Sequence, residues 1–418
     1  MVKTRKRILI LGAGFAGLRT AIDLSSKINL RAYEIILIDK SDIHLYTPDL
    51  YEIASAFNEN ITEECLTQLK ETVATRITSI IDKDKVAFIQ DTVTDIDPKK
   101  RSVKFKKGKR MSYDILVVAL GSVPNYFGIP GLEEHGHPLK TINNALEIHC
   151  LLDRFLPQIK RPRNVTITVG GGGPTGVELV AELVGYLNLL CNKYNYPREK
   201  VRIELIEAGD HLAGMGDKGT AAIIKRFEEK GIVTRLKNRI IEVEARKVHI
   251  QDVNGKVKKV MCDMVIWTGG VQVNPLIQKT IGDPELRGAI EVNEYLQSKQ
   301  DKRIFAAGDN AYTKNPKTGK PAGMLAQVAF VQGILLASNI AAKIARTPMK
   351  KFKIHPNIYV IPIGGRFGLC KVFNWVFTGT WPWYLRRLIS LKYASSLLPF
   401  WQAIRKWQHG TKIFIEND

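Results

Sequence analysis

The sequence predicts an α/β fold with two similar βαβ motifs, and three observations support this prediction. A short apolar segment, a cluster of glycines and an apolar helical pattern follow one another twice in the 418 residues. Each repeat continues into a second apolar segment that ends in an acidic residue. Further apolar segments end in turns of small residues, as parallel strands do beside a ligand crevice. We therefore expect two Rossmann-like dinucleotide-binding domains.

The apolar segments place the elements of both motifs. Short apolar runs between turn residues predict buried strands, and longer periodic patterns predict helices. The first run follows a basic start and meets the glycines without a cleavage site, so we expect a strand there and not a signal peptide. The predicted strand, helix and second strand occupy residues 7–11, 15–24 and 34–38 in the first motif and 165–169, 177–190 and 201–206 in the second.

Both motifs place three glycines between the first strand and the helix. In this context the first glycine allows a tight turn, the second lets the backbone approach a pyrophosphate, and the third lets the helix pack on the strand. The positive end of the helix then faces the phosphates. The glycines are Gly12, Gly14 and Gly17 in the first motif and Gly171, Gly173 and Gly176 in the second.

An acidic residue ends the second strand of each motif, Asp39 in the first and Glu207 in the second. A carboxylate at this position accepts hydrogen bonds from the hydroxyls of an adenosine ribose and repels a 2′-phosphate, which favours NADH over NADPH. Two such motifs need two dinucleotides. The economical pair is a tightly held FAD and a diffusing NADH.

Other segments complete the α/β pattern. Three apolar strands end in small-residue turns, at residues 115–119 before Gly121, at 265–267 before Gly269 and Gly270, and at 304–307 before Asp309. Charged, alternating stretches at residues 85–113 and 237–262 predict antiparallel ribbons attached to the sheets.

Two acidic residues have both a structural and a functional interpretation. Glu178 lies in the first turn of the second motif's helix, where it is either a partner of the helix dipole or a residue near the nicotinamide and the flavin. Asp309 is either a helix N-cap or a ligand of FAD hydroxyls.

Residues 324–342 form a stretch of nineteen residues without a formal charge, long enough to raise the question of a transmembrane helix. Gln327, Gln332 and Asn339 interrupt the stretch, so we expect a buried helix of a large domain. Its positive N-terminal end, at Ala326 and Gln327, would stabilise the negative charge of a reduced flavin. An ordinary capped core helix is the alternative.

The formal charge of +21 is concentrated near the C-terminus. Residues 310–415 contain sixteen Lys or Arg and no Asp or Glu, and five of the six tryptophans fall in the same region. Trp beside basic residues is favoured at lipid headgroups. Because nucleic-acid binding predicts the charge but not the tryptophans, we expect an anionic membrane surface and no nucleic acid. The tryptophans are Trp375, Trp381, Trp383, Trp401 and Trp407.

The C-terminal segment contains two predicted amphipathic helices, with Pro382 and Pro399 as their first helical residues. The first carries Arg386, Arg387 and Lys392, and Gly410 offers a stop for the second. We expect both to lie on a membrane surface, and a dimer interface or a lid on the enzyme core is the alternative. The second helix places Phe400, Ala403, Ile404 and Trp407 on one face and Gln402, Arg405, Lys406 and Gln408 on the other.

The five cysteines are scattered and form no metal-ligand spacing, so we expect a reducing compartment and no metal.

With these residues assembled, the chain resembles the type II NADH dehydrogenases, single-subunit NADH:quinone oxidoreductases with the glutathione-reductase-like FAD/NAD(P) fold. The resemblance covers nearly the whole chain and rests on ILGAGFAGL, LIDKSDIHLYTPDLYEIAS, YDILVVALGSVPNYFGIPG, VGGGGPTGVELVAEL, VRIELIEA, VIWTGGV, IFAAGDNA and AGMLAQVA. It implies an FAD domain in two parts (residues 1–120 and 271–350), a connecting segment (121–162), an NADH domain (163–270) and a membrane-docking region (351–418).

The resemblance also implies site residues. Glu178 and Gln327 are the expected catalytic residues. The family has two glutamines four residues apart on the quinone side, whereas here Val331 stands in that place and Gln332 follows it, so the quinone contacts stay open. FAD is expected at Gly12, Gly14, Gly17, Asp39, Gly121, Asp309 and Gln327, NADH at Gly171, Gly173, Gly176, Glu178 and Glu207, and further cofactor contacts at Ala16, Lys40, Thr47, Ala119, Thr175, Gly269, Gly270 and Ala326.

The expected reaction passes hydride from NADH to FAD and then two electrons to a membrane quinone, without ion pumping. The expected location is the cytoplasmic face of the cell membrane, and a homodimer is left open. A sulfide:quinone or other-acceptor reductase of the same fold is the alternative enzyme, against which the lack of a suitable cysteine pair counts. A basic flavoprotein that binds nucleic acid is the alternative from another class.

Overall fold

The computed structural model describes residues 5–314, 319, 321–353 and 358–415. These residues divide into two compact units. Unit 1 comprises Met1–Leu45, Ala74–Val123 and Val271–His355, and unit 2 comprises Tyr46–Val73, Pro124–Gly270 and Pro356–Asp418. This division does not test the domain boundaries inferred from the sequence, and those boundaries stay a prediction.

Unit 1 is built on a five-stranded parallel sheet with the strand order β21-β9-β1-β2-β5. Its central strand β1 is apolar and buried from Ile8 to Leu11, as expected of a parallel strand covered on both faces. The predicted strands of the first motif and the strand before Asp309 all lie in this sheet. The strands are β21 (Ile304–Ala306), β9 (Ile115–Val118), β1 (Lys6–Leu11), β2 (Tyr33–Asp39) and β5 (Val86–Gln90).

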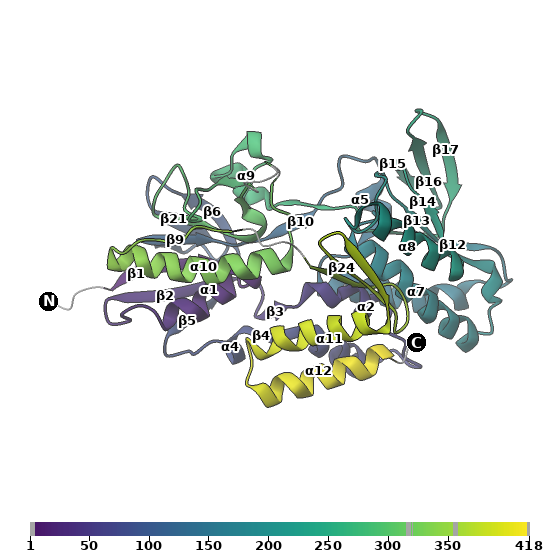
Figure 1. Cartoon of the computed structure of the whole chain (residues 1–418), viewed down its shortest axis with the longest axis horizontal. Coiled ribbons are helices and arrows are strands. Elements are labelled where there is room, and N and C mark those ends of the chain that lie inside the picture. Colours follow the sequence, from purple (N-terminus) through teal and green to yellow (C-terminus); the bar gives the residue numbers. More distant parts are fainter. Residues whose placement is uncertain (1–4, 315–318, 320, 354–357, 416–418) are drawn as a thin grey trace. The chain divides into compact units, whose positions relative to one another are not determined.

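Two helices of unit 1, α1 (Phe15–Ser25) and α10 (Ala326–Ala345), lie side by side (Figure 1). Their backbones approach closely at Gly333, where a Cβ would lie 2.5 Å from the carbonyl oxygen of Ala16. The hydroxyl of Thr20 donates to the carbonyl oxygen of Gly333 at 3.2 Å. These contacts hold α1, which follows β1, against α10, which follows β21 along the chain.

Among the described residues, α10 is the helix that has the length and apolar composition of a membrane span. Its polar side chains bond to unit 1 itself. The amide nitrogen of Asn339 donates to the carbonyl oxygens of Tyr295 and Lys350, at 3.0 and 2.9 Å. Packing on α1 and these bonds tie α10 to unit 1, and 39% of its apolar window is buried inside the protein.

The expectation of one antiparallel ribbon over residues 85–113 is wrong at its start. β5 pairs in parallel with β2, with Val86 opposite Ile35, and only the later strands are antiparallel. The apolar pattern of a strand does not reveal its partner, which explains the error. The other elements of unit 1 are β3 (Ile43–Leu45), β4 (Ala74–Arg76), α4 (Ile77–Ile80), β6 (Val93–Asp97), β7 (Ser102–Phe105), β8 (Arg110–Ser112), β19 (Val271–Val273), α9 (Pro275–Thr280), β20 (Ile290–Glu291) and β22 (Ala311–Tyr312).

Unit 2 contains a second five-stranded parallel sheet, with the order β11-β18-β12-β13-β14. The helix α7 (Pro174–Lys193) follows β12, as the second motif predicts. The predicted ribbon over residues 237–262 is confirmed as three antiparallel strands. The strands are β11 (Gly136–Pro138), β18 (Met264–Trp267), β12 (Val165–Gly170), β13 (Val201–Ile206) and β14 (Val233–Arg235), then β15 (Asn238–Glu244), β16 (Lys247–Asp252) and β17 (Val257–Met261).

The C-terminal part of unit 2 is a three-stranded antiparallel sheet followed by two helices that lie side by side (yellow in Figure 1). The helix α12 continues through Gly410, so the expected stop there is wrong. Gly410 is buried, and a Cβ on it would lie 3.3 Å from the ring of Phe414 and 3.6 Å from the Cβ of Thr72. These elements are β23 (Tyr359–Pro362), β24 (Gly368–Val372), β25 (Trp375–Gly379), α11 (Thr380–Ser395) and α12 (Phe400–Ile415).

The remaining helices of unit 2 surround these sheets. The helix α6 starts with a capping box, in which the Thr141 hydroxyl accepts from the Asn144 backbone N–H at 3.2 Å. These helices are a 3₁₀ turn (Thr47–Asp49), α2 (Leu50–Ala54), α3 (Glu63–Val73), α5 (Leu132–His135), α6 (Ile142–Phe155) and α8 (Gly216–Glu229).

Candidate dinucleotide-binding sites

The turn between β1 and α1 has the geometry that the first glycine motif predicts. Gly12 has φ of +97°, and a Cβ on it would lie 2.2 Å from the carbonyl oxygen of Ala119. A Cβ on Gly17 would lie 1.9 Å from the carbonyl oxygen of Gly12, whereas a Cβ on Gly14 would meet no atom within 4 Å. Two glycines are thus required by packing, and Gly14 leaves open space at the start of the helix. We call these glycines, with Asp39, the first cradle.

Asp39 closes the first cradle from the end of β2. One carboxylate oxygen accepts from the Ala13 backbone N–H at 2.6 Å, and the other accepts from Ser41 N–H at 2.9 Å. Burial raises the pKa of Asp39, and these backbone hydrogen bonds oppose the shift. Each oxygen keeps a lone pair for a ribose hydroxyl. His44 supports the same turn, with Nδ1 2.8 Å from the carbonyl oxygen of Ala13.

The turn between β12 and α7 repeats this geometry in unit 2. Gly171 has φ of +107°, and a Cβ on it would lie 2.4 Å from the Cα of Gly269. A Cβ on Gly176 would lie 1.9 Å from the carbonyl oxygen of Gly171, and one on Gly173 would meet no atom within 4 Å. The roles of the three glycines are the same as in the first cradle. We call these glycines, with Glu207, the second cradle.

Glu207 at the end of β13 takes the place that Asp39 has in the first cradle. Its two carboxylate oxygens accept from the backbone N–H groups of Gly172, at 2.5 Å, and Gly209, at 2.6 Å. The side chain is therefore held against the glycine turn by two charge-assisted hydrogen bonds. A fixed carboxylate in this position suits a ribose diol and disfavours a phosphate.

The residues after β9 and β21 meet in unit 1. Asn310 donates to the carbonyl oxygen of Gly121 at 2.9 Å and accepts from its N–H at 3.0 Å. The Ser122 hydroxyl donates to the carboxylate of Asp309. The structure thus joins the segments of Gly121 and Asp309 through their neighbours Asn310 and Ser122. Sequence reasoning missed Asn310 and Ser122, although both are polar neighbours of predicted site residues.

The start of α10 lies after the same turn along the chain. Ala326 and Gln327 are its first two residues, and the residue before them, Leu325, supplies no side-chain cap. The first backbone N–H groups of α10 are therefore available to a ligand. Gln332 is buried, and its side-chain amide does not reach the start of the helix. The side-chain oxygen instead accepts from the Gly308 backbone N–H at 2.7 Å. Gln332 positions the turn at Asp309.

The other predicted cofactor residues fall in both units. In unit 1, Ala16 and Ala119 are buried at the first cradle, and Lys40 is exposed after β2. In unit 2, Thr175 is the second residue of α7, Gly269 and Gly270 follow β18, and Thr47 begins the 3₁₀ turn. Thr47, predicted as a cofactor contact, therefore belongs to unit 2, whereas the predicted FAD residues belong to unit 1.

A buried cluster of charged residues in unit 2 is close enough to Glu178 to interact with its charge. The sequence did not predict this cluster. Arg386 of α11 pairs with Asp49 at 2.5 Å and donates to the carbonyl oxygen of Pro48 at 3.1 Å. Arg387 pairs with Glu52 at 2.9 Å. Both arginines are buried, so the expectation that they give α11 a basic outer face is wrong. Their carboxylate partners are more than three hundred residues away in the sequence.

Two acidic members of this cluster, Glu178 and Glu52, have raised pKa values because they are buried. Burial raises the pKa of Glu178 well above the ordinary carboxyl range, and Arg386 opposes this shift. Burial likewise raises the pKa of Glu52 to about 7, against the attraction of Arg387. Burial therefore favours the protonated form of the Glu178 carboxyl.

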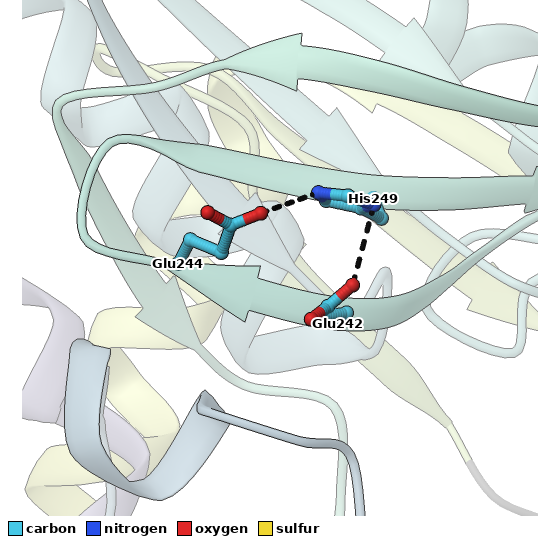
Figure 2. A group of neighbouring side chains, drawn as sticks. All are labelled: Glu242, Glu244 and His249. Atoms are coloured by element: carbon cyan, nitrogen blue, oxygen red, sulfur yellow. Dashed lines mark hydrogen bonds and ion pairs between the residues drawn. The ribbon is translucent and has the colours of Figure 1, made fainter.

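A separate group of charged side chains lies on the β15–β16 hairpin (Figure 2). His249 is flanked by two carboxylates, with Nδ1 3.3 Å from Glu242 and Nε2 2.8 Å from Glu244. Lys247 also pairs with Glu244 at 2.8 Å. Both imidazole nitrogens and both carboxylates are thus engaged in cross-strand pairs, which account for the group as support of the hairpin.

Comparison with known proteins gives the same architecture. Residues 6–333 match the model of the pyridine nucleotide-disulphide oxidoreductase family. A type II NADH:quinone oxidoreductase from Staphylococcus epidermidis is 30% identical over 398 residues, which cover 94% of this chain and 96% of the relative.

Two solved structures resemble the chain over most of its length. NDH2 from Plasmodium falciparum in complex with NADH has a TM-score of 0.83 at 19% identity, covering 99% of this chain and 98% of that one. The sulfide:quinone oxidoreductase of Aquifex aeolicus has a TM-score of 0.77 at 21% identity, covering 96% and 92%. At these identities the likeness concerns the fold.

Proposed function

The chain belongs to the pyridine nucleotide-disulphide oxidoreductases and, within them, to the type II NADH:quinone oxidoreductases, and we propose that it transfers hydride from NADH to FAD and then two electrons to a membrane quinone. The observation that carries this proposal is the pair of glycine turns with the same geometry, each closed by an acidic residue. The proposal includes no ion pumping.

FAD fits the first cradle and the residues joined to it. Open space at Gly14 leaves room for a pyrophosphate at the start of α1, and Asp39 presents a carboxylate for the ribose. Asp309, held by Ser122, supplies a further acceptor for hydroxyl groups. When bound, FAD supplies the two-electron acceptor that links NADH to a quinone. The chain binds and orients this group.

The start of α10 supplies positive potential for the flavin. The uncapped N–H groups at Ala326 and Gln327 form the positive end of a helix of twenty residues. Such an end stabilises negative charge without any rearrangement. Gln327 adds an exposed amide at this end, which is its proposed role.

The second cradle suits NADH. Open space at Gly173 receives the pyrophosphate, and the fixed carboxylate of Glu207 binds the ribose diol and repels the 2′-phosphate of NADPH. Glu178 lies four residues after Pro174, at the start of α7, and burial raises the pKa of its carboxyl. We assign Glu178 the role of holding or moving a proton during turnover.

The C-terminal helices support docking on an anionic membrane, and we place this docking on the cytoplasmic side. Apolar side chains of α11 and α12 are exposed, including Tyr384, Leu388 and Trp401. Lys392 and Arg405 are exposed on the same helices, and no acidic residue occurs from 310 to 415. Aromatic and basic side chains together favour the headgroup region. A homodimer that covers these side chains is the alternative.

Turnover measurements test the proposed reaction. The FAD-loaded protein should oxidise NADH when a short-chain quinone is supplied, with one quinone reduced for each NADH. Sulfide should not replace NADH as donor. Oxidation of sulfide at a rate equal to that of NADH would refute the assignment in favour of a sulfide:quinone reductase.

Vesicle flotation tests the docking. Replacing Trp401 by serine should weaken binding to anionic vesicles and leave NADH oxidation with a water-soluble acceptor unchanged. Deleting the whole segment is a poorer test, because Arg386 and Arg387 neutralise buried carboxylates. Equal binding of neutral and anionic vesicles at low salt would contradict the electrostatic part of the proposal.

A further inference from the structure

The turn between β24 and β25 exposes an aromatic residue in a backbone conformation that favours glycine. Val372 and Trp375 form the last pair of the ladder, so Phe373 and Asn374 make a two-residue turn. Phe373 has φ of +52°, where a Cβ is disfavoured and glycine is the usual residue. Its side chain is 67% exposed. Packing within the chain therefore does not explain why phenylalanine stands at this position.

Exposed aromatic residues continue from this turn along β25. Trp375 and Phe377 are alternate residues of the strand and share one side of it, with 71% and 42% of their surfaces exposed. The ring of Trp381, at the start of α11, meets the ring of Phe377 edge to face at 5.9 Å. We call Phe373, Trp375, Phe377 and Trp381 the hairpin aromatic patch.

The hairpin aromatic patch is apolar at the edge of a sheet. β25 is the outer strand of the order β23-β24-β25. Outer strands usually carry charged residues that prevent association with other chains, but β25 has the sequence WVFTG. Arg366 and Lys392 are exposed elsewhere in this C-terminal region, and it contains no acidic residue up to Ile415. A contiguous apolar patch in such a setting indicates a binding surface.

We propose that the β24–β25 hairpin is a wedge that inserts the hairpin aromatic patch into the headgroup region of an anionic bilayer. This inference rests on the proposed membrane docking and adds to the C-terminal helices a second element, the hairpin that precedes α11. Trp and Phe beside cations match the chemistry of anionic headgroups over acyl chains. A second copy paired along β25 would cover the strand but not Phe373, which lies beyond the last ladder pair.

A substitution by glycine measures the contribution of the aromatic ring while the turn stays folded. Phe373→Gly removes the ring and relieves the positive φ, so the hairpin should remain folded and the thermal midpoint should not fall. Phe127→Gly is a matched control, because Phe127 is 62% exposed and has φ of +51° but lies outside the C-terminal sheet. Trp375→Thr, which keeps a strand-forming residue, is a second variant of the patch.

The measurement is the partition coefficient of full-length, FAD-loaded protein onto vesicles of mixed phosphatidylcholine and phosphatidylglycerol. We expect Phe373→Gly to lower it about tenfold, the effect of losing one inserted aromatic side chain. Trp375→Thr should also lower it, and Phe127→Gly should leave it unchanged.

Three outcomes overturn the wedge. Partition of Phe373→Gly equal to that of Phe127→Gly, while the parent binds, refutes the wedge and leaves docking by the helices intact. Failure of the parent to bind these vesicles refutes the docking itself. A shift from dimer to monomer in light scattering for Trp375→Thr, with partition unchanged, assigns the patch to a second copy of this chain.

Discussion

Replacing Arg387 by methionine tests whether α11 is held to the α2 segment by a buried ion pair. The guanidinium donates to both oxygens of Glu52, at 3.1 and 2.9 Å. It also lies over the rings of Trp383 and Phe414, 5.3 and 5.0 Å from their centroids. Methionine keeps an apolar stem in this position and removes the charge and both hydrogen bonds.

The expected loss follows from the carboxylate that is left behind. Breaking a buried pair costs about 3–5 kcal/mol because the remaining charge is uncompensated. Burial already raises the pKa of Glu52 to about 7 with Arg387 present, and the substitution raises it further. The folded protein then holds a proton that the unfolded chain releases, so stability falls as the pH rises. A loss of about 3 kcal/mol corresponds to roughly 6–12 °C in the thermal midpoint.

Thermal unfolding followed by circular dichroism at about pH 6 and about pH 8 measures this effect. The decrease should be larger at the higher pH, where Glu52 is ionised in the parent. Lys392→Met removes an exposed cation of the same helix and should change little. The double variant Arg387→Met with Glu52→Gln should regain most of the lost thermal midpoint. Equal midpoints for Arg387→Met and Lys392→Met at both pH values would refute the buried pair.

Three further predictions concern single residues. Glu207→Gln removes the charge that excludes a 2′-phosphate, so kcat/KM for NADPH relative to NADH should rise about tenfold, and an unchanged ratio would contradict the assignment. Burial lowers the pKa of His149 to about 4. The folded protein therefore loses stability as pH falls from about 6.5 to about 4, and urea titrations of His149→Gln should show a smaller acid loss than the parent. Glu178→Gln mimics the protonated carboxyl, because burial raises the pKa of Glu178. Its thermal midpoint should thus resist rising pH better than that of the parent, whose folded state holds an extra proton, and an equal decline would count against a buried proton.

The local parts of both cradles could be predicted from the sequence. A strand, three glycines and a helix form one contiguous segment, and the spacing of the glycines determines where a Cβ would clash, as at Gly12 and Gly171. The acidic residues at the ends of β2 and β13 follow from the same segments. Their bonds back to Ala13 and Gly172 are consequences of that short-range geometry.

Contacts between distant segments could not be predicted in this way. Arg387 meets Glu52 across 335 residues, and Asn310 meets Gly121 across 189. A basic residue on an amphipathic helix has the same pattern whether it faces lipid or a buried carboxylate, which explains the error at Arg386 and Arg387. The extension of α12 through Gly410 was missed because a glycine in the sequence does not show by itself whether it ends a helix or lies within one.

The central claim is that the first cradle holds FAD and the second holds NADH, and a matched pair of substitutions tests it. Gly14 and Gly173 are the N-cap residues of α1 and α7, with φ of −72° and −66°. Aspartate is a favoured N-cap residue and has space at both positions. Its carboxylate would repel a pyrophosphate. Serine, which caps equally well without charge, is the control at each position.

The measurement is the absorbance of the flavin band in each purified variant before and after anaerobic addition of NADH. The account predicts that Gly14→Asp is purified without flavin, whereas Gly173→Asp keeps its flavin but is not bleached by NADH. Both serine variants should behave like the parent. A flavin-loaded Gly14→Asp protein, or a Gly173→Asp protein bleached as readily by NADH as its serine control, would contradict the assignment of the two cradles.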